Sequence, residues 1–407
     1  MRKLSQFEKR FIAAHEILMY SVGVGNPNVI PKIIDNIRKS IIGFRLKTDG
    51  ENFITRPTSR TVHSLPNSIK TAYEAALYVS EHYWPDFSKV LATIAANDTF
   101  VSVCSCHGIT DGGFYRKLTP VLLDDNIQEV NGLPLTVGEL FSNELKTAKP
   151  YPHLEEDELK VSRMPITYSH PETPSTLHRR NIMDSFPIEN HKWYNKSTNK
   201  LNGLTESLWL SIAIATETMQ RVKRPLNIGC LTCVDLRSFV SPQQKSKIDF
   251  VGNNFASVSV VLDKIDDKMT LYEAGKQLRN KFNNKVFNGE IFNALKQSTS
   301  YGCVDDKNAI VWVSNIGQFN IRKPIEDICL LQNMHSKMCE NTVTLSSFSK
   351  TGNGKNIITN RFQYSPTALS DEDANKINKA VGYFMRNFPP EMTVGKAIEE
   401  IKKLHNK

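Results

Sequence analysis

Apolar residues in the first third of the chain recur with helical spacing or gather in short runs. The clearest helical pattern is a stripe of isoleucines at positions 30, 33, 34, 37 and 41, which fall on one face of a helix. Asn28 precedes this stripe and is its predicted N-cap, and Pro31 is tolerated in a first helical turn. Similar spacing predicts helices over 4–16 and 68–80, and we expect a short apolar run at 17–24 and a strand over 100–106.

The second half of the chain mixes the same kinds of element. Thr270 and Glu273 form a capping-box pattern, which predicts that a helix starts there. The glycine-rich stretch at 351–354 separates two apolar runs, as in a hairpin. The remaining patterns predict helices over 204–219, from Ser370 and over 394–404, and strands at 228–234, 255–262, 309–314, 343–348 and 357–364.

Strands and helices are therefore mixed in both halves, without the regular strand–helix alternation of a doubly wound sheet. A chain of 407 residues is long enough for two domains. We expect an α/β (α+β) protein of two similar units, each a mixed sheet covered by helices. Residues 146–200 are rich in Pro, His, Asn, Ser and charge, and we interpret them as a linker. The expected halves are residues 1–175 and 176–407.

Charge and composition mainly exclude classes of partner. The net charge of +9 is spread along the chain, with no block of five or six like charges, so we expect no nucleic-acid arm. The excess fits either an anionic ligand or a lysine-biased solvated surface, and we favour the surface. No secretory h-region follows the N-terminus and no apolar stretch is long enough for a membrane span. We therefore expect a cytoplasmic protein without a transmembrane segment.

Seven cysteines, an odd number, fit a reducing compartment better than a disulfide framework. Cys230 and Cys233 have CxxC spacing, but no second pair follows at the distance of a zinc finger. They fall in a predicted strand, whose period of two places them on opposite faces. We expect no metal site.

One short motif carries chemistry. The predicted strand over 100–106 runs directly into His107, which begins the pattern His-x-x-x-Asp-Gly with Asp111 and Gly112. A histidine at a strand end, before a glycine-bearing loop, is displayed on rigid support, and imidazole can take a proton near neutral pH. Asp111 would brace the turn by pairing with an arginine. The alternative is a core histidine that satisfies a backbone group.

Other catalytic motifs are missing or incomplete. The stretch Gly352–Lys355 lacks the first half of a phosphate-binding loop and the Ser/Thr after its lysine, so a hairpin turn explains it better. No Gly-x-Ser-x-Gly sequence occurs, which argues against a serine hydrolase.

The segment from His107 to Gly112 resembles the active-site motif of the CoA-dependent acyltransferase superfamily. That superfamily includes chloramphenicol acetyltransferase, the plant BAHD enzymes, condensation domains of peptide synthetases and alcohol acyltransferases. Further segments resemble it in the expected order and span nearly the whole chain; they are residues 2–8, 203–208, 234–237, 251–255, 313–317 and 364–370. The branch of alcohol acetyltransferases and mycobacterial polyketide-associated acyltransferases is the most similar.

The resemblance implies two chloramphenicol-acetyltransferase-like halves with an active-site channel between them. His107 would be the general base that takes the acceptor's proton, and attack on the thioester would be direct, without an acyl-enzyme. Asp111 would be structural with Arg237 as its salt-bridge partner, and Gly112 would form the turn. Ser314 and Asn315 are candidates for binding the oxyanion or substrate, with a strand-end polar pair as the alternative.

Two departures from the superfamily patterns narrow the expected reaction. Cys106 stands where condensation domains usually carry a second histidine, and the Asp-Phe-Gly-Trp-Gly motif of the plant enzymes is missing. We therefore expect an O-acyltransferase that uses acyl-CoA as co-substrate and an alcohol as acceptor, with no permanently bound cofactor. Two alternatives stay open. One is a condensation-type enzyme that takes its acyl group from a carrier protein and forms an ester or amide. The other is an inactive binding module of the same fold.

Overall fold

The computed structural model describes most of the 407 residues. The described ranges are 1–133, 135–149, 163–164, 179–219, 226–240, 252–300, 309–334, 342–366 and 369–406. Residues 150–162 and 165–178 of the expected linker at 146–200 lie outside these ranges, as does Val251. The division at residue 175 stays a prediction.

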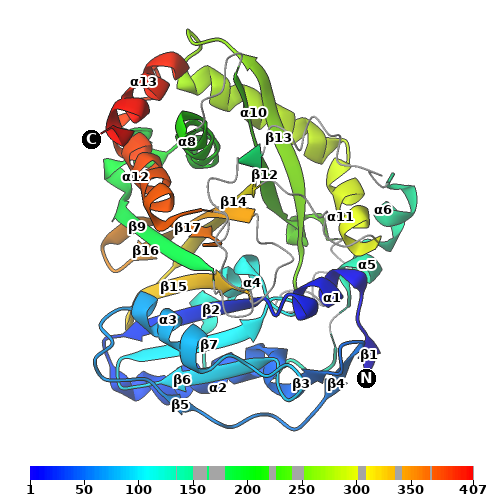
Figure 1. The fold of residues 1–407 in the computed structure, drawn as a ribbon. Coiled ribbons are helices and arrows are strands. Elements are labelled where there is room, and N and C mark those ends of the chain that lie inside the picture. The colour runs from blue at the N-terminus through cyan, green and yellow to red at the C-terminus, as the bar shows by residue number, and fades with distance from the viewer. Residues whose placement is uncertain are drawn as a thin grey trace.

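The first sheet has five strands in the order β15-β2-β7-β6-β5. The strands are β2 (Ile17–Val24), β5 (His63–Ser64), β6 (Ala92–Ala96), β7 (Phe100–Cys106) and β15 (Ile325–Asn333). Only β5 and β6 pair in parallel, so the sheet is mixed. Helix α3 (Ala72–His82) packs on β2, β7 and β15, and α2 (Ile30–Ser40) packs against β7 (Figure 1).

The second sheet has seven strands, in the order β13-β12-β14-β16-β17-β9 with β8 paired to β14. Its parallel pairs are β12 with β14 and β14 with β16. The strands are β8 (Arg163–Met164), β9 (Arg180–Pro187), β12 (Leu226–Asp235), β13 (Phe255–Ile265), β14 (Ala309–Asn320), β16 (Thr342–Gly352) and β17 (Lys355–Tyr364). The helices around this sheet in Figure 1 are α8 (Leu204–Met219), α10 (Leu271–Phe287), α11 (Glu290–Ser300), α12 (Asp371–Asn387) and α13 (Val394–His405).

Shorter elements complete the described part of the fold, including a three-stranded sheet in the order β1-β4-β3 and a two-stranded sheet of β10 and β11. The remaining helices are α1 (Gln6–Ala13), α4 (Gly112–Leu118), α5 (Val137–Leu140) and α6 (Ser142–Thr147). The remaining strands are β1 (Arg2–Lys3), β3 (Leu46–Thr48), β4 (Asn52–Thr55), β10 (Tyr194–Asn195) and β11 (Lys200–Leu201). Short 3-10 helices are η1 (Pro27–Val29), η2 (Ile42–Arg45), η3 (Thr119–Val121), η5 (Ile188–Asn190) and η6 (Leu236–Phe239).

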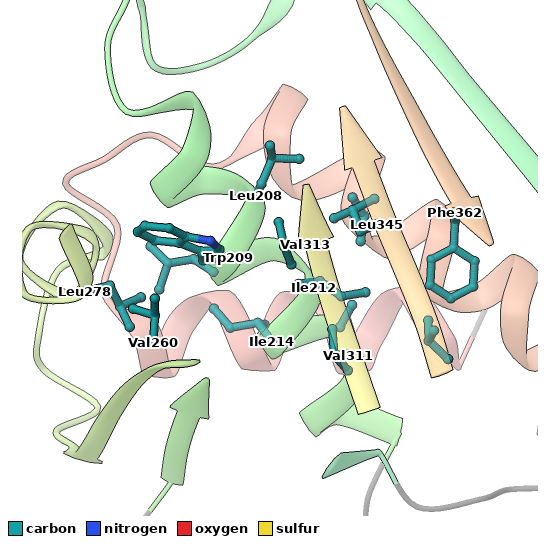
Figure 2. Packing of buried hydrophobic residues seen from close by; sticks show 14 of the residues in the cluster. Leu208, Trp209, Ile212, Ile214, Val260, Leu278, Val311, Val313, Leu345 and Phe362 are labelled. Carbon is teal, nitrogen blue, oxygen red and sulfur yellow. The ribbon is translucent and has the colours of Figure 1, made fainter. Parts of the chain in front are cut away.

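Each sheet has its own hydrophobic core. In the second, Leu208 and Ile212 of α8 point toward Val313 and Leu345 of the sheet, and Trp209 lies beside Val260 and Leu278 (Figure 2). The first core gathers the buried residues of β2, β7 and α3 with the isoleucine stripe of α2. Burying a large aliphatic side chain contributes about 1.5–3 kcal/mol, so two such clusters are sufficient to stabilise two sheets.

The expected fold class is confirmed: both sheets are mixed and covered by helices. The strand at 100–106 and the helix at 204–219 have the expected bounds, and the capping box at Thr270 is present. The prediction that Asn28 caps the second helix was wrong. Asn26 instead caps the 3-10 turn η1, and α2 begins only at Ile30, because the chain needs one tighter turn before the regular helix.

Strand β15 joins the two sheets. It follows β14 of the second sheet in the sequence, yet it pairs antiparallel with β2 at the edge of the first sheet. Residues from late in the chain therefore lie beside residues 16–24. Within the part of the chain that the structure describes, no helix is long and apolar enough to cross a membrane.

Candidate functional site

His107 lies at the carboxyl end of β7, where the chain leaves the first sheet. Its backbone N–H donates to the Glu16 carbonyl at 2.8 Å, which ties the loop to the start of β2. The following turn leads into α4, whose N-cap is Asp111: the carboxylate accepts from the Phe114 N–H at 2.7 Å. The motif is thus a strand, a turn and a capped helix, which holds the histidine on rigid backbone.

The ring of His107 is oriented by one backbone carbonyl. Nδ1 lies 2.9 Å from the Thr110 oxygen, and a carbonyl only accepts, so Nδ1 must carry the proton in the neutral ring. Nε2 then keeps its lone pair. Glu16 Oε1 lies 3.8 Å from Nε2, too far for a hydrogen bond. Phe11 stacks on the ring at 4.6 Å, and Phe255 flanks it at 5.7 Å.

Asn253 adds a contact from the second half of the chain. Its Nδ2 donates to the His107 carbonyl at 2.6 Å, while its Oδ1 is buried without a hydrogen-bond partner. Nδ2 also lies 3.2 Å from His107 Nδ1, but both atoms are donors in this tautomer, so the carbonyl is the real acceptor. Asn253, which lies just before the start of β13, therefore helps to fix the histidine backbone.

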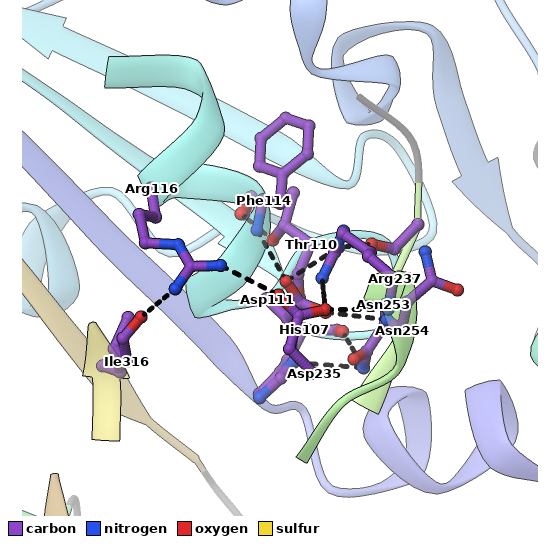
Figure 3. Close-up of polar contacts among 12 residues, drawn as sticks. His107, Thr110, Asp111, Phe114, Arg116, Asp235, Arg237, Asn253, Asn254 and Ile316 are labelled. Carbon is purple, nitrogen blue, oxygen red and sulfur yellow. Dashed lines mark hydrogen bonds and ion pairs between the residues drawn. The ribbon is translucent and has the colours of Figure 1, made fainter. Parts of the chain in front are cut away.

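Asp111 and Arg237 form a buried ion pair between the two halves of the chain (Figure 3). Arg237 Nη2 lies 2.9 Å from Asp111 Oδ1, and Nη1 lies 3.0 Å from Oδ2. The Asn254 N–H donates to Oδ2 at 2.7 Å. Burial raises the pKa of Asp111, but the charge of Arg237 and these hydrogen bonds outweigh it and bring the pKa below its usual value.

Arg237 has further partners on its other edge. It contacts Asp235 Oδ1 at 3.1 Å and donates to the Gly252 carbonyl at 2.9 Å. Burial lowers the pKa of Arg237, and the charges of Asp111 and Asp235 raise it by more. Asp235 also accepts from Arg116 at 3.2 Å. The cluster is closed around Gly113, where a Cβ would lie 2.6 Å from Arg237 Nη1.

A cavity opens in front of the His107 ring. It encloses about 1120 Å³ of empty space, part of it open to solvent. Its walls come from the first sheet and from the second, so it lies between them. The lining includes His107, Glu16, Gln332, Cys233, Ser314 and Arg361.

The candidate residues from the sequence have different places around this cavity. Gly112 begins α4 with Ile316 packed against it, where a Cβ would lie 2.9 Å from Ile316 Cγ2. Ser314 and Asn315 both line the cavity. The Asn315 amide already donates to Thr205 Oγ1 at 2.9 Å and accepts from the Gly317 N–H. Both stay candidate donors to substrate, because the Asn315 amide keeps a second N–H and the Ser314 hydroxyl lies beside the Cys233 thiol.

Sequence reasoning missed several residues at the site. Glu16 and Phe11 come from the amino-terminal segment, and Gln332 and Arg361 come from late strands. A charged residue directly before a fully buried apolar run was a usable signal for Glu16. Asn253 stood inside the segment 251–255 that resembles the superfamily, but no role had been assigned to it.

The site is equipped for proton transfer and has no prepared nucleophile. Cys233 lines the cavity, but burial raises the pKa of its thiol to about 11, so it stays protonated and is a poor nucleophile at neutral pH. Across the described ranges, no group of three or more His, Cys, Asp or Glu side chains could hold a metal ion. His107 lines the cavity with Nδ1 bonded to the Thr110 carbonyl, so its Nε2 can take a proton from a bound hydroxyl or amine.

Comparisons with known proteins agree with this fold. Residues 204–359 match the family described as phthiocerol/phthiodiolone dimycocerosyl transferase C-terminus. No curated protein matches the chain significantly. Polyketide synthase associated protein 5 from Mycobacterium tuberculosis is similar in structure, with a TM-score of 0.66 and 12% identity over 94% of this chain and 97% of that one.

Two further solved structures, a condensation domain and an O-acetyltransferase, are similar in fold. The starter condensation domain of rhizomide synthetase, in complex with C8-CoA and Leu-SNAC, has a TM-score of 0.65 and 12% identity over 97% of this chain and 96% of that one. Trichothecene 15-O-acetyltransferase from Fusarium sporotrichioides has a TM-score of 0.63 and 12% identity over 95% of each chain. The resemblance to the acyltransferase and condensation-domain superfamily is confirmed in fold, and for residues 204–359 in sequence.

Proposed function

We propose that this protein is an acyltransferase that moves an acyl group from an acyl-CoA thioester to the hydroxyl of a small alcohol. The observation that carries the proposal is the bond from His107 Nδ1 to the Thr110 carbonyl, at 2.9 Å. In that tautomer the lone pair of Nε2 is available to a substrate bound in the cavity that His107 lines. A general base needs this arrangement: the correct tautomer, a fixed ring and access to the proton.

The reaction uses few protein groups. His107 Nε2 takes the hydroxyl proton as the alcohol oxygen attacks the thioester carbon. The tetrahedral intermediate then collapses, the C–S bond breaks and the leaving thiolate takes the proton back from the imidazolium. The Glu16 carboxylate, 3.8 Å from Nε2, stabilises that imidazolium. Ser314 is the proposed donor to the oxyanion, a role typically worth about 3–4 kcal/mol.

Attack by the acceptor is direct in this proposal. An acyl-enzyme would need a nucleophile beside His107, and the raised pKa of Cys233 argues against that thiol. Asp111 and Arg237 act through the backbone: they fix the start of α4 and the segment that carries Asn253. We assign them a structural role.

The test is release of free thiol from acyl-CoAs of increasing chain length with a panel of alcohols and amines. For His107→Ala we expect a loss of roughly 10²–10⁴-fold in kcat, the usual contribution of a general base. His82→Ala is the matched control, because His82 is exposed on α3 and should keep the wild-type rate. A His107→Ala variant with full rate contradicts the general-base role.

The donor is tested in the same assay with acyl groups on a phosphopantetheine carrier protein. Turnover of carrier-bound thioester alone, without turnover of acyl-CoA, identifies the condensation-type alternative. No turnover of either donor with any acceptor contradicts the enzyme proposal and leaves a binding module of this fold.

A further inference from the structure

Arg361 of β17 is a buried charge with too few partners. Its side chain lines the same cavity as His107, and the residue is 2% exposed. Nη2 donates to Gln332 Oε1 at 3.2 Å, whereas Nε and Nη1 have no hydrogen-bond partner. A buried guanidinium without partners for its N–H groups is costly, so native proteins rarely keep one without a reason.

A second unsatisfied group lies beside it. Ser346 of β16 is directly opposite Arg361 in the strand register, so both side chains point to the same face of the sheet. Its hydroxyl is buried, lines the cavity and has no hydrogen-bond partner. Two neighbouring polar groups thus offer N–H and O–H donors to the same space.

The charge at this end of the cavity is positive. Arg179 is buried, lines the same cavity and donates to Gln363 Oε1 at 3.3 Å. Burial and the like charge of Arg179 lower the pKa of Arg361 to about 10, although Cys329 and Glu16 oppose that shift. Arg361 therefore stays protonated at neutral pH.

The carboxylates that line the cavity interact with residues other than Arg361. Asp111 and Asp235 pair with Arg237 and Arg116. Glu16 accepts from Gln332 Nε2 and faces His107. In the part of the chain that the structure describes, Arg361 therefore meets no carboxylate at ion-pair distance.

The position of Arg361 relative to His107 is also defined. Gln332 of β15 connects the two ends: its Oε1 accepts from Arg361, and its Nε2 donates to Glu16, which faces His107 Nε2. A molecule that fills the cavity can therefore touch the base with one group and the guanidinium with another. The two contacts come from different sheets, β7 and β17.

We infer that Arg361, with Ser346 and Arg179, binds a carboxylate carried by one of the two substrates. A carboxylate only accepts and a guanidinium only donates, so the pair is complementary and would satisfy the buried N–H groups. The substrate is either a hydroxy acid, whose hydroxyl reaches His107, or a dicarboxylic acyl thioester. This inference rests on the proposed acyl transfer and specifies its substrate class.

The first experiment compares charged substrates with neutral partners of the same skeleton. Acceptors are ω-hydroxy acids of three to eight carbons and their methyl esters. Donors are dicarboxylic monoacyl-CoAs of four to eight carbons and their methyl esters. We expect a preference in kcat/KM of roughly 10–100-fold for the free carboxylate on one side, as for a charged hydrogen bond. The side on which it occurs identifies the substrate that carries the carboxylate.

Variants connect this preference to the arginine. Arg361→Met should abolish it while activity on the methyl esters persists, and Arg361→Lys should keep part of it. Arg45→Met is the matched control, because Arg45 is largely buried and donates to the Arg38, Lys39 and Val130 carbonyls away from the cavity. It should keep the full preference. A wild-type enzyme without any carboxylate preference, or an unchanged preference in Arg361→Met, overturns the inference.

The second experiment does not require catalysis. Glutarate is titrated by calorimetry into wild type, Arg361→Met and Arg45→Met, with dimethyl glutarate as the neutral probe. We expect glutarate to bind wild type and Arg45→Met, and to bind Arg361→Met roughly 10–100-fold more weakly. Equal binding to all three proteins overturns the inference. Glutarate binding without any acyl transfer contradicts the proposed function alone, whereas transfer that does not depend on Arg361 contradicts the inference alone.

Discussion

Two arginines line the same cavity and differ in how fully they are bonded. Arg237 holds both oxygens of Asp111, one oxygen of Asp235 and the Gly252 carbonyl. Arg361 is equally buried and has one contact, to the Gln332 amide. The difference indicates separate purposes. A fully bonded charge contributes to the architecture, whereas an under-bonded one is available to a ligand.

The surroundings of the two arginines explain how the fold accommodates each. Arg237 lies where η6 meets the start of α4, and its ion pair crosses between segments that do not share a sheet. Arg361 lies inside β17, with backbone pairing on both sides, to Ser346 of β16 and Met183 of β9. The strand is held by its neighbours, so an unfavourable side chain there is tolerated.

The largest expected effect is on protein stability and follows from a change in Asp111, the ion-pair partner of Arg237. Asp111→Asn keeps the shape but leaves Arg237 without its main counter-charge, and breaking a buried pair costs about 3–5 kcal/mol. We expect the free energy of unfolding, from urea titration, to fall by that amount. A loss below about 1 kcal/mol would remove the architectural role of this pair.

The loss of unfolding free energy in Asp111→Asn should also depend on pH. The pKa of Asp111 is lowered in the folded protein, so its contribution is present above the unfolded value of about 3.9 and is lost as pH falls through the folded pKa. The difference in unfolding free energy between wild type and Asp111→Asn should therefore shrink towards low pH. Urea titrations from pH 7 down to pH 3 measure it. A constant difference across this range would contradict the ion-pair explanation.

A smaller effect tests how tightly the residues around Arg237 are packed. In Gly113→Ala the new Cβ would meet Arg237 Nη1 at 2.6 Å and Asp235 Oδ2 at 2.8 Å. Overpacking of this kind typically costs about 1–3 kcal/mol. Gly138→Ala in α5 is the control, since its Cβ has only Thr136 Oγ1 nearby, at 3.8 Å. Thermal unfolding should show a lower midpoint for Gly113→Ala and no loss for Gly138→Ala.

The smallest expected effect is at the other arginine. Arg361→Met removes a buried charge that has one hydrogen bond, and replacing buried charges by apolar side chains is often neutral or stabilising. We expect the unfolding free energy to change by less than about 1 kcal/mol, or to rise, and to do so equally at pH 7 and pH 4. A loss as large as that of Asp111→Asn would erase the distinction between the two arginines.

Local sequence patterns were sufficient for the strand that leads into the motif His107–Gly112 and for several helices. The strand Phe100–Cys106 was predicted with its observed bounds, because all seven of its residues are apolar or small and buried. The helices at 204–219 and from Ser370 also follow from spacing and caps within their own segments. Such patterns are local, and burial on one or both faces enforces them. The cap at Asn28 failed, because two asparagines two residues apart offered the same local signal.

The sequence alone could not predict which residues line the cavity. Its walls bring Glu16, Gln332 and Arg361 together from three distant segments, because β15 crosses to the first sheet and pairs with β2. No hydrophobic periodicity within a single segment indicates that β15 pairs with β2. The register between strands decides which side chains lie next to each other. The sequence by itself determined the strand Phe100–Cys106 and the position of His107 directly after it. Only the tertiary structure decided that Arg237 has several hydrogen-bond partners and Arg361 has one, since these partners depend on which segments pack together.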